Sequence, residues 1–320
     1  MDLRQLRALV TVGETGNVTR ASVLLNLVQP AVSRQLKLLE QDVGTPLFER
    51  GRHGMALTPA GRTLAGYARR ILDELARARA ELQPSSGDVG GLVNVGLLAS
   101  TAELLTGPLV RAVAAAYPAI RLRVTVGYSG YLRRWLESGE LDAAVLYDVR
   151  PGAALQITRL LSDALWVVAP ASAGLRAGRP VTMKQFARHP VVLPSAAQGL
   201  RTMIEQAAST AGVALDVAVE TNDVGAQKRL VAEGMGYTVL PGVAVAADLA
   251  HGRLCAAPLT RPGVARKVVL ATPTARPPAA AVRCVMAALV ACMRQAVDDG
   301  RWPAASWLPD GSLGRSASAS

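Results

Sequence analysis

The sequence predicts an α/β fold in which a small all-α-type N-terminal domain and one long helix precede a larger domain of alternating strands and helices. Three observations lead to this prediction. Residues 1–58 carry apolar residues at helical spacing around one short hairpin. Residues 59–83 keep that spacing without interruption. From Leu92 onward, short apolar runs typical of strands alternate with stretches typical of helices.

Residues 18–37 predict two short helices joined by a tight turn. The first covers about 19–25 and begins near Asn17 or Thr19, both of which are good helix caps. It is expected to bury Ala21, Leu24 and Leu25. A Gln-Pro pair follows the turn, and proline is tolerated in the first turn of a helix because its missing N–H would have no intrahelical partner. The second helix is therefore expected to start near Gln29.

The second helix separates an apolar face from a polar one. Its apolar stripe repeats at four, three and four residues and consists of Val32, Leu36, Leu39 and Val43. The opposite face holds Pro30, Ser33, Arg34, Lys37 and Gln41. Glutamine can read adenine edges, and arginine can read guanine or phosphate. A tight helix pair of this kind is typical of a protein that reads the major groove of DNA.

Residues 47–61, LFERGRHGMALTPAG, predict a turn-rich hairpin. Arg50 and Arg52 lie near its tip, where they are expected to reach phosphates or a minor groove. An ordinary surface loop is the alternative interpretation. Thr58 is then expected to cap a new helix that has Pro59 in its first turn.

This long helix, over 59–83, carries a regular apolar seam. Its members repeat at four, three, four, three and four residues: Leu64, Ala68, Ile71, Leu75, Ala78 and Leu82. The spacing predicts a dimerisation helix, parallel or antiparallel. A helix that packs on its own domain would show the same pattern. The composition of residues 84–91 is that of a hinge between domains.

Positive charge is concentrated near the N-terminus. The 320 residues carry a net charge of +11, and residues 1–70 hold ten Arg or Lys against five Asp or Glu. This favours a polyanionic partner, although an arginine-rich solvated surface would show the same excess. The apolar runs are too short or too interrupted to span a membrane, and the N-terminus lacks the order of a signal peptide. Cys255, Cys284 and Cys292 form no CxxC pair, so we expect a cytoplasmic protein.

The N-terminal sequence resembles the DNA-binding domain of the LysR-type transcriptional regulators. The signature QPAVSRQLKLLE…GTPLFER…LTPAG carries the resemblance, which covers residues 1–62 almost without a gap. It implies a winged helix-turn-helix over 1–58, with the helix-turn-helix at about 18–37, then a dimerising linker helix and an effector domain. Val28 departs from the family, which usually has serine there. Valine cannot cap a helix, at a local cost of about 1 kcal/mol.

The resemblance also implies the partners. They are double-stranded DNA with an inverted-repeat operator, a small-molecule effector and a second copy of the chain. The dimer is expected to pair into a tetramer, RNA polymerase is a further candidate partner, and neither a cofactor nor a metal is implied. The residues expected to contact DNA are Thr19, Arg20, Gln29, Pro30, Ser33, Arg34, Lys37, Arg50 and Arg52.

Residues 92–298 predict an α/β domain with a mostly parallel sheet. Segments such as GELDAAVLY and GMGYTVLP resemble the family's effector domain, which is similar to periplasmic binding proteins and has a cleft between two lobes. Lobe I is expected to comprise about 92–163 and 270–298, and lobe II about 164–269. Residues 299–320 have the composition of a tail and are expected to be disordered in large part.

The effector cleft is expected where helices follow strands, because ligands bind beyond the carboxyl ends of strands and helix N-termini offer free N–H groups. Small hydroxylated residues occupy such places, which also match effector-binding positions of the family. Plain helix caps are the alternative for each. Converging helix N-termini would favour an anionic effector such as a small carboxylate. The expected effector-binding residues are Ser100, Thr101, Ser129, Gly130, Tyr147, Ser195, Gln198, Gly199, Asn222 and Asp223.

Three other functions fit the sequence less well. An enzyme is not indicated, because His53, His189 and His251 have no metal-ligand spacing and no phosphate loop or nucleophile motif is present. A thiol redox sensor of the same family would need Cys284 and Cys292 to bridge about 12 Å along one helix. A solute receptor would need a secretion signal where the DNA-binding domain stands. We therefore predict a regulator without catalytic activity.

Overall fold

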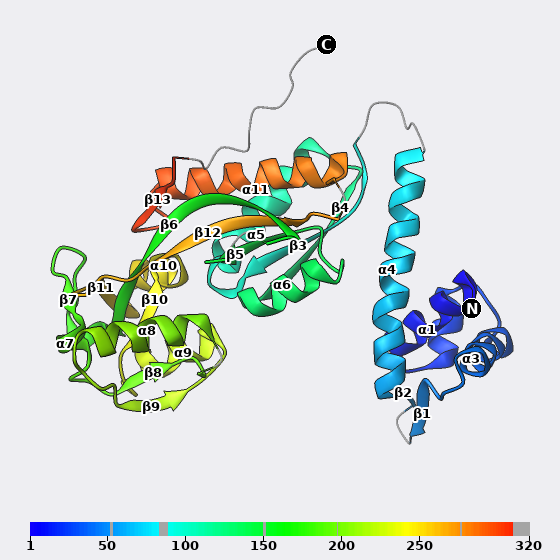
Figure 1. The fold of residues 1–320 in the computed structure, drawn as a ribbon, viewed down its shortest axis with the longest axis horizontal. Coiled ribbons are helices and arrows are strands. Elements are labelled where there is room, and N and C mark those ends of the chain that lie inside the picture. Colours follow the sequence, from blue (N-terminus) through cyan, green and yellow to red (C-terminus); the bar gives the residue numbers. More distant parts are fainter. Residues whose placement is uncertain (52–53, 83–88, 150–151, 197, 276, 310–320) are drawn as a thin grey trace, which may run out of the picture. The chain divides into compact units, whose positions relative to one another are not determined.

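The computed structural model describes residues 1–51, 54–82, 89–149, 152–196, 198–275 and 277–309. Contacts divide the chain into two compact units, Met1–Leu92 and Val93–Ser320, which we call the head unit and the effector unit. Figure 1 shows the helices and strands of each. The finer domain boundaries stay a prediction, and most of the expected hinge at 84–91 lies outside the described residues.

Three helices form the core of the head unit: α1 (Leu3–Thr15), α2 (Val18–Leu24) and α3 (Gln29–Val43). A capping box starts α1, in which the Asp2 side chain and the Gln5 side chain each accept from the other's backbone N–H. The buried cluster includes Leu9, Ala21, Val32, Leu36 and Leu39. Two expectations were wrong. Leu24 is 63% exposed and Val43 is 37% exposed, because each is the last residue of its helix and lies past the packed turns.

The predicted hairpin is present as β1 (Phe48–Gly51) and β2 (Gly54–Leu57), which pair antiparallel. Thr58 then starts the long helix α4 (Pro59–Leu82), because its hydroxyl accepts from the backbone N–H of Gly61. The same hydroxyl donates to the carbonyl of Pro46, which ties the helix start to the strand. A Cβ at Gly61 would lie 2.0 Å from the carbonyl oxygen of Leu47. This close approach requires glycine.

The effector unit opens with strands and helices in alternation: β3 (Gly91–Leu98), α5 (Ala99–Ala116), β4 (Ile120–Gly127), α6 (Ser129–Glu137) and β5 (Ala143–Tyr147). The chain then crosses to a second lobe on β6 (Leu155–Pro170) and returns on β12 (Ala265–Pro273). Figure 1 shows these two long strands running through both halves of the unit.

The sheet is mixed, so the expectation of a mostly parallel sheet was wrong. Its main path has the order β4-β3-β5-β12-β6-β11-β7, and β10 and β13 also pair with β6. β3 and β5 are parallel, whereas β6 runs antiparallel to β10, β11, β12 and β13. The physical reason is the double crossing. A chain that leaves a lobe on one strand and returns on its neighbour makes those two strands antiparallel.

The second lobe lies between the crossings. Its elements are η1 (Ala171–Ala173), β7 (Val181–Thr182), α7 (Met183–Phe186), β8 (Val191–Leu193), α8 (Gly199–Thr210), β9 (Val217–Glu220), α9 (Val224–Ala232), β10 (Thr238–Pro241), α10 (Gly242–Ala250) and β11 (Leu254–Thr260). β8 and β9 form a parallel pair. Buried clusters around Phe186 and around Leu240 fill the lobe.

The last long helix, α11 (Ala280–Asp298), packs against α5. By length and composition alone it would pass as a membrane-spanning helix, so the expectation that its apolar run is too short was wrong. Nine of its side chains, among them Val285, Leu289 and Met293, are however buried within the unit. This is the burial pattern of a core helix in a globular domain.

Residues 299–309, which we call the C-terminal segment, contradict the expectation of a disordered tail. β13 (Ala305–Trp307) pairs antiparallel with the middle of β6. Trp302 is 1% exposed and is among the largest fully buried side chains of the described chain. An indole of this size buries enough apolar surface to order a short segment that composition alone would assign to a tail. Residues 310–320 lie outside the described residues.

We predict that Gly61→Ala destabilises the head unit by about 1–3 kcal/mol, because the added methyl meets the Leu47 carbonyl and must displace strand or helix. Urea denaturation followed by circular dichroism measures the change. Gly66→Ala, in the same helix with nothing within 4 Å of the new Cβ, is the control. It should raise stability by about 0.5–1 kcal/mol. Equal effects of the two substitutions would contradict the close approach at Gly61.

Candidate DNA-binding surface and effector pocket

The start of α3 is open. Asn26 adopts a left-handed backbone conformation with φ of 51°, which turns the chain between α2 and α3. Val28 occupies the N-cap and supplies no side-chain hydrogen bond, as its chemistry predicts, and Pro30 lies in the first turn. Only the backbone N–H of Gln29 is thus left for another partner among the first three residues of α3, because Pro30 has no N–H and the N–H of Ala31 donates to the carbonyl of Val28. The positive end of the helix dipole favours a negatively charged one, such as phosphate.

The side chains predicted to contact DNA lie on α2 and on the polar face of α3. Six of them are exposed and Ser33 is half-buried, while the opposite face of α3 is buried through Val32, Leu36 and Leu39. Arg50 lies on β1 with its side chain outside the described part, and Arg52 lies outside the described residues altogether. The exposed six are Thr19, Arg20, Gln29, Pro30, Arg34 and Lys37.

The predicted dimer seam on α4 has two parts. Ala68 is fully buried in the core of the head unit, and Leu64 packs against that core. Further along, Ile71 is 42% exposed, Leu75 is half-buried and Ala78 is exposed. The side chain of Leu82 lies outside the described part. The beginning of the seam therefore packs on its own domain, and the part from Ile71 onward does not.

A pocket of about 840 Å³ lies in the effector unit, lined by residues of both lobes. Three helices begin at its wall: α5 after Leu98, α6 after Tyr128 and α8 after Gln198. In the described chain, none of these three N-cap side chains makes a cap hydrogen bond. The first N–H groups of the helices are thus available to a ligand.

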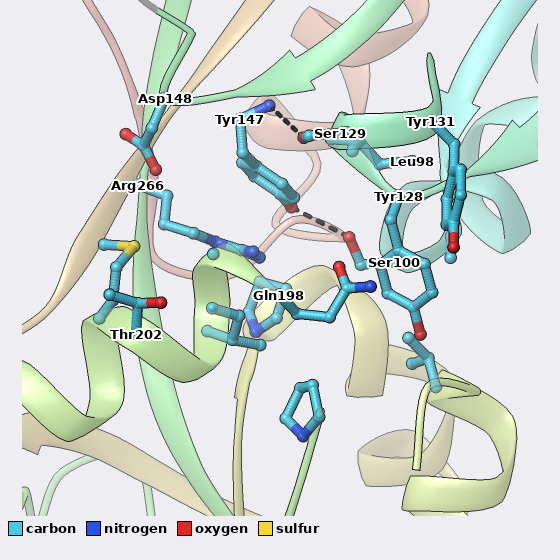
Figure 2. Close-up of a pocket in the computed structure, with 18 of the residues that line it drawn as sticks. Leu98, Ser100, Tyr128, Ser129, Tyr131, Tyr147, Asp148, Gln198, Thr202 and Arg266 are labelled. Carbon is cyan, nitrogen blue, oxygen red and sulfur yellow. Dashed lines mark hydrogen bonds between the residues drawn. The ribbon is translucent and has the colours of Figure 1, made fainter. Parts of the chain in front are cut away.

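Two serines and a tyrosine form the polar centre of the pocket (Figure 2). Ser100 Oγ lies 3.1 Å from the hydroxyl of Tyr147, and Ser129 Oγ accepts a hydrogen bond of 2.9 Å from the backbone N–H of Tyr147. Both serines follow a strand and open a helix, as the sequence predicts. Their side chains engage Tyr147 and do not cap their own helices, so the alternative of plain helix caps does not describe them.

Arg266, near the start of β12, extends into the same pocket beneath the Tyr147 ring (Figure 2). Its side chain is 6% exposed, and its guanidinium carbon lies 3.4 Å from the centre of that ring. Its Nε is buried and has no hydrogen-bond partner among the described residues. A buried positive charge at the wall of a pocket is costly unless an opposite charge lies nearby. Arg266 is therefore suited to anchor an anion.

Asp163, on β6, lies behind Tyr147 and is fully buried. Its Oδ2 accepts a hydrogen bond of 3.2 Å from the Tyr147 hydroxyl, and its Oδ1 accepts one of 3.1 Å from Nε1 of Trp302. Burial raises the pKa of Asp163 to about 6, against the lowering effects of Arg266 and the two donors. Burial also raises the pKa of Tyr147, so its hydroxyl stays protonated.

The two lobes touch each other beside the pocket. The hydroxyl of Tyr128, just before α6, donates to the carbonyl oxygen of Asn222 in the second lobe. Lys228 on α9 lies 3.4 Å from Glu103 on α5 and 2.7 Å from Asp248. A ligand in the pocket therefore adds to contacts that already hold the lobes together.

Six of the ten predicted effector residues line the pocket: Ser100, Ser129, Gly130, Tyr147, Gln198 and Gly199. The other four are not among the lining residues, and each of them makes hydrogen bonds within the protein. Thr101 is fully buried and donates to the carbonyl of Leu98. Ser195 donates to the side chain of Asn222, and Asp223 caps α9. Thr101 and Asp223 each lie next to a helix start, and each side chain bonds to a nearby backbone group: the carbonyl of Leu98 for Thr101 and the N–H of Ala226 for Asp223.

Sequence reasoning missed Arg266, Asp163 and Trp302. Arg266 opens the apolar run RKVVLAT, and Asp163 directly precedes ALWVVAP. A charge at the edge of an otherwise apolar strand is a usable signal, because a buried charge needs a partner or a function. Trp302 gave no such signal, since its neighbours have the composition of a tail.

These features define a class of protein: a ligand-responsive DNA-binding regulator, with a helix-turn-helix unit and a two-lobed pocket domain. Residues 3–62 match the bacterial regulatory helix-turn-helix protein, lysR family, and residues 86–294 match the LysR substrate binding domain. The chain belongs to the LysR family of transcriptional regulators. It combines a DNA-binding domain with an effector-binding domain, and it is not an enzyme.

Known relatives agree in sequence and fold. The HTH-type transcriptional regulator BbuR of Bordetella bronchiseptica is 30% identical over 303 residues, which is 95% of this chain and 93% of BbuR. The nitrogen assimilation regulatory protein nac of Escherichia coli is 29% identical, over 75% of this chain and 78% of nac. The structure of full-length CbnR in complex with its target DNA has a TM-score of 0.68 at 21% identity, covering 92% of this chain and 99% of CbnR. That last likeness shows the fold alone.

We predict that stability of the effector unit falls by about 3 kcal/mol between pH 4 and pH 7 through Asp163. The folded-state pKa, about 6, lies above the ordinary value of 3.8, so folding favours the protonated acid. Its contribution is fully present below pH 4 and is lost as the pH rises through 6. Unfolding midpoints across this range measure it. Asp163→Asn cannot titrate and should remove this part of the profile; an unchanged profile would contradict the raised pKa.

Proposed function

We propose that this regulator senses a small organic anion in the pocket of the effector unit and passes the signal to DNA held by α3. The observation that carries the proposal is the largely buried guanidinium of Arg266 at the wall of the pocket. Three uncapped helix starts add N–H donors there. Arg133 and Arg134 add positive charge, and Asp148 is the one acid among the described lining residues.

The proposed signal is a change in the relation between the lobes. Arg266, Tyr147 and Ser100 line the pocket from β12, β5 and α5, whereas Gln198 and Thr202 line it from the second lobe. A ligand that contacts both sides favours one arrangement by its differential affinity for the two states. We infer that this shift reaches the head unit through the segment at 84–91.

The proposal also includes the partners of the protein: a second copy of the chain, an inverted-repeat operator and RNA polymerase. A dimer would form along α4 from Ile71 onward, and two heads would then bind an inverted-repeat operator. Pairing of dimers into a tetramer and contact with RNA polymerase follow from the family resemblance, as does function in the cytoplasm. The exposed apolar side chains of Ile71 and Tyr67, which are 42% and 56% exposed, support a partner helix at this surface.

For DNA binding, we predict that Arg34→Ala weakens specific binding by about 1–3 kcal/mol if the guanidinium reaches a base edge. Gln29→Ala and Ser33→Ala should change the preferred sequence. Arg52→Ala should weaken binding to all sequences and flatten its salt dependence. Sites selected from random DNA, followed by anisotropy titrations at several salt concentrations, measure these effects. Gln41→Ala, exposed at the far end of α3, is the control. If all four variants match the parent, α3 does not read the groove.

For the dimer, we predict that Leu75→Glu dissociates the protein into monomers and abolishes tight operator binding. The substitution places a charge in the seam, where it is costly unless paired. Sedimentation velocity measures the assembly state. Ala76→Glu adds the same charge at the next position, which is exposed and lies outside the seam, so this control should remain a dimer. A dimeric Leu75→Glu protein with unchanged affinity for its operator would exclude this interface.

For the effector, we predict that carboxylates bind and the corresponding amides do not, and that Arg266→Gln lowers carboxylate affinity at least about tenfold. Ser100→Ala should cost about 1 kcal/mol for a carboxylate that also hydrogen-bonds to this side chain. Isothermal titration calorimetry on a panel of carboxylate and amide pairs measures both. Arg159→Gln, exposed on β6, is the control. Carboxylate binding that is untouched by Arg266→Gln and Ser100→Ala would place the effector elsewhere.

A further inference from the structure

Four side chains form one chain of hydrogen bonds from the C-terminal segment to the pocket. Trp302 Nε1 contacts Asp163 Oδ1 at 3.1 Å, Asp163 Oδ2 contacts the Tyr147 hydroxyl at 3.2 Å, and that hydroxyl lies 3.1 Å from Ser100 Oγ. Trp302 lies beyond residues 86–294, the range that matches the substrate binding domain of the family.

The chemistry of the four groups fixes the direction of every proton. An indole N–H can only donate, and a carboxylate can only accept. The ionised Asp163 therefore accepts from both Trp302 and Tyr147. Since the Tyr147 proton is given to Asp163, the oxygen of Tyr147 must accept the proton of Ser100. Ser100 then has no proton left for a ligand and offers only lone pairs to the pocket.

The pocket thus offers both hydrogen-bond donors and a hydrogen-bond acceptor next to the ring of Tyr147. Arg266, at the face of Tyr147, offers donors and a positive charge. Ser100, at the hydroxyl of Tyr147, offers an acceptor. Because both contact the same ring, one small ligand can reach both (Figure 2). A simple carboxylate satisfies Arg266 and leaves the Ser100 oxygen without a donor.

We propose that the effector is a carboxylate that also carries a hydrogen-bond donor, a hydroxyl or an amine, near its carboxyl group, and that Trp302 enforces this choice by keeping Asp163 an acceptor. The proposal rests on the proposed anion-sensing function. Trp302 is a positioning residue, because it acts on the ligand through Asp163, Tyr147 and Ser100.

The direction of the chain depends on the charge of Asp163. The groups that face it are Arg266 from β12, Tyr147 from β5 and Trp302 from the C-terminal segment, and only Arg266 is charged among them. A protonated Asp163 can donate to Tyr147, which frees Tyr147 to donate to Ser100 and Ser100 to donate to the ligand. Selectivity for a donor-bearing ligand should therefore disappear as the pH falls through about 6, where Asp163 takes up its proton.

The test uses the full-length protein and three matched probes: mandelate, O-methylmandelate and phenylacetate. Mandelate carries the donor, the ether carries an acceptor in its place, and phenylacetate carries neither. Calorimetry at pH 7.5 should show mandelate binding at least about tenfold more tightly than the ether. Ser100→Ala should bring that ratio close to one. Equal affinity of the wild-type protein for mandelate and the ether, or binding of neither, would overturn the donor requirement.

The role of Trp302 is tested by a pH profile. Trp302→Phe removes a hydrogen bond that lowers the pKa of Asp163, so both the loss of selectivity and the Asp163 titration should move to higher pH. Carboxyl ¹³C NMR, with the Asp163 resonance assigned by Asp163→Asn, follows that titration without any ligand. Trp307→Phe, in the same segment, is the control, because its indole Nε1 has no partner among the described residues.

A titration of Asp163 that is the same in Trp302→Phe, Trp307→Phe and the parent would exclude the positioning role. If Trp302→Phe does not fold, 3-benzothienylalanine at position 302 keeps the two-ring shape and lacks the N–H. The outcomes separate the two proposals. Loss of carboxylate binding in Arg266→Gln together with equal affinity for mandelate and its ether would uphold the anion site and reject the donor requirement.

Discussion

The structure of the effector unit depends on the antiparallel pairing of β6. This strand of 16 residues crosses from one lobe to the other and pairs with β10, β11, β12 and β13. Its middle carries Asp163, which sits opposite both Arg266 on β12 and Ala305 on β13 in the strand register. The ladder hydrogen bonds thus place the acid, the guanidinium and the C-terminal segment together.

The sequence predicted the elements with local signals and missed those that depend on distant partners. Pro30 and the apolar stripe indicated α3, and the start of α6 at Ser129 followed from a hydroxyl after a strand. The full length of β6 was missed, because a strand that crosses from one lobe to the other shows no single periodicity along its 16 residues. Trp302 was missed because the contacts of its indole lie far away in sequence: its hydrogen-bond partner Asp163 is 139 residues away.

The local sequence predicted residues at helix starts beside the pocket, but it did not predict Arg266 there. Hydroxyls and glycines at strand-to-helix junctions can be recognised from local sequence, which explains why six of the predicted effector residues line the pocket. Arg266 and Asp163 belong to strands, where a charged residue in sequence is more often at a solvated edge. Only the fold shows that both are buried, at 6% and 0% exposure. The burial of these two charges, and therefore their effect on a ligand, depends on the tertiary structure and cannot be inferred from the local sequence.

The energy needed for switching argues for a ligand that uses the whole pocket. To move an equilibrium from 1:99 to 99:1, a ligand must favour one state by about 5.5 kcal/mol. A charge-assisted hydrogen bond to Arg266 would contribute about 1.5–3 kcal/mol, and only if it differs between the states. The ion pair of Lys228 and Glu103 between the lobes is weak, since Glu103 is 67% exposed and Lys228 has Asp248 as its nearer partner. Under the proposed function, an effector would therefore combine Arg266 and Ser100 with contacts from Gln198 and Thr202, and a molecule that spans both lobes meets this requirement.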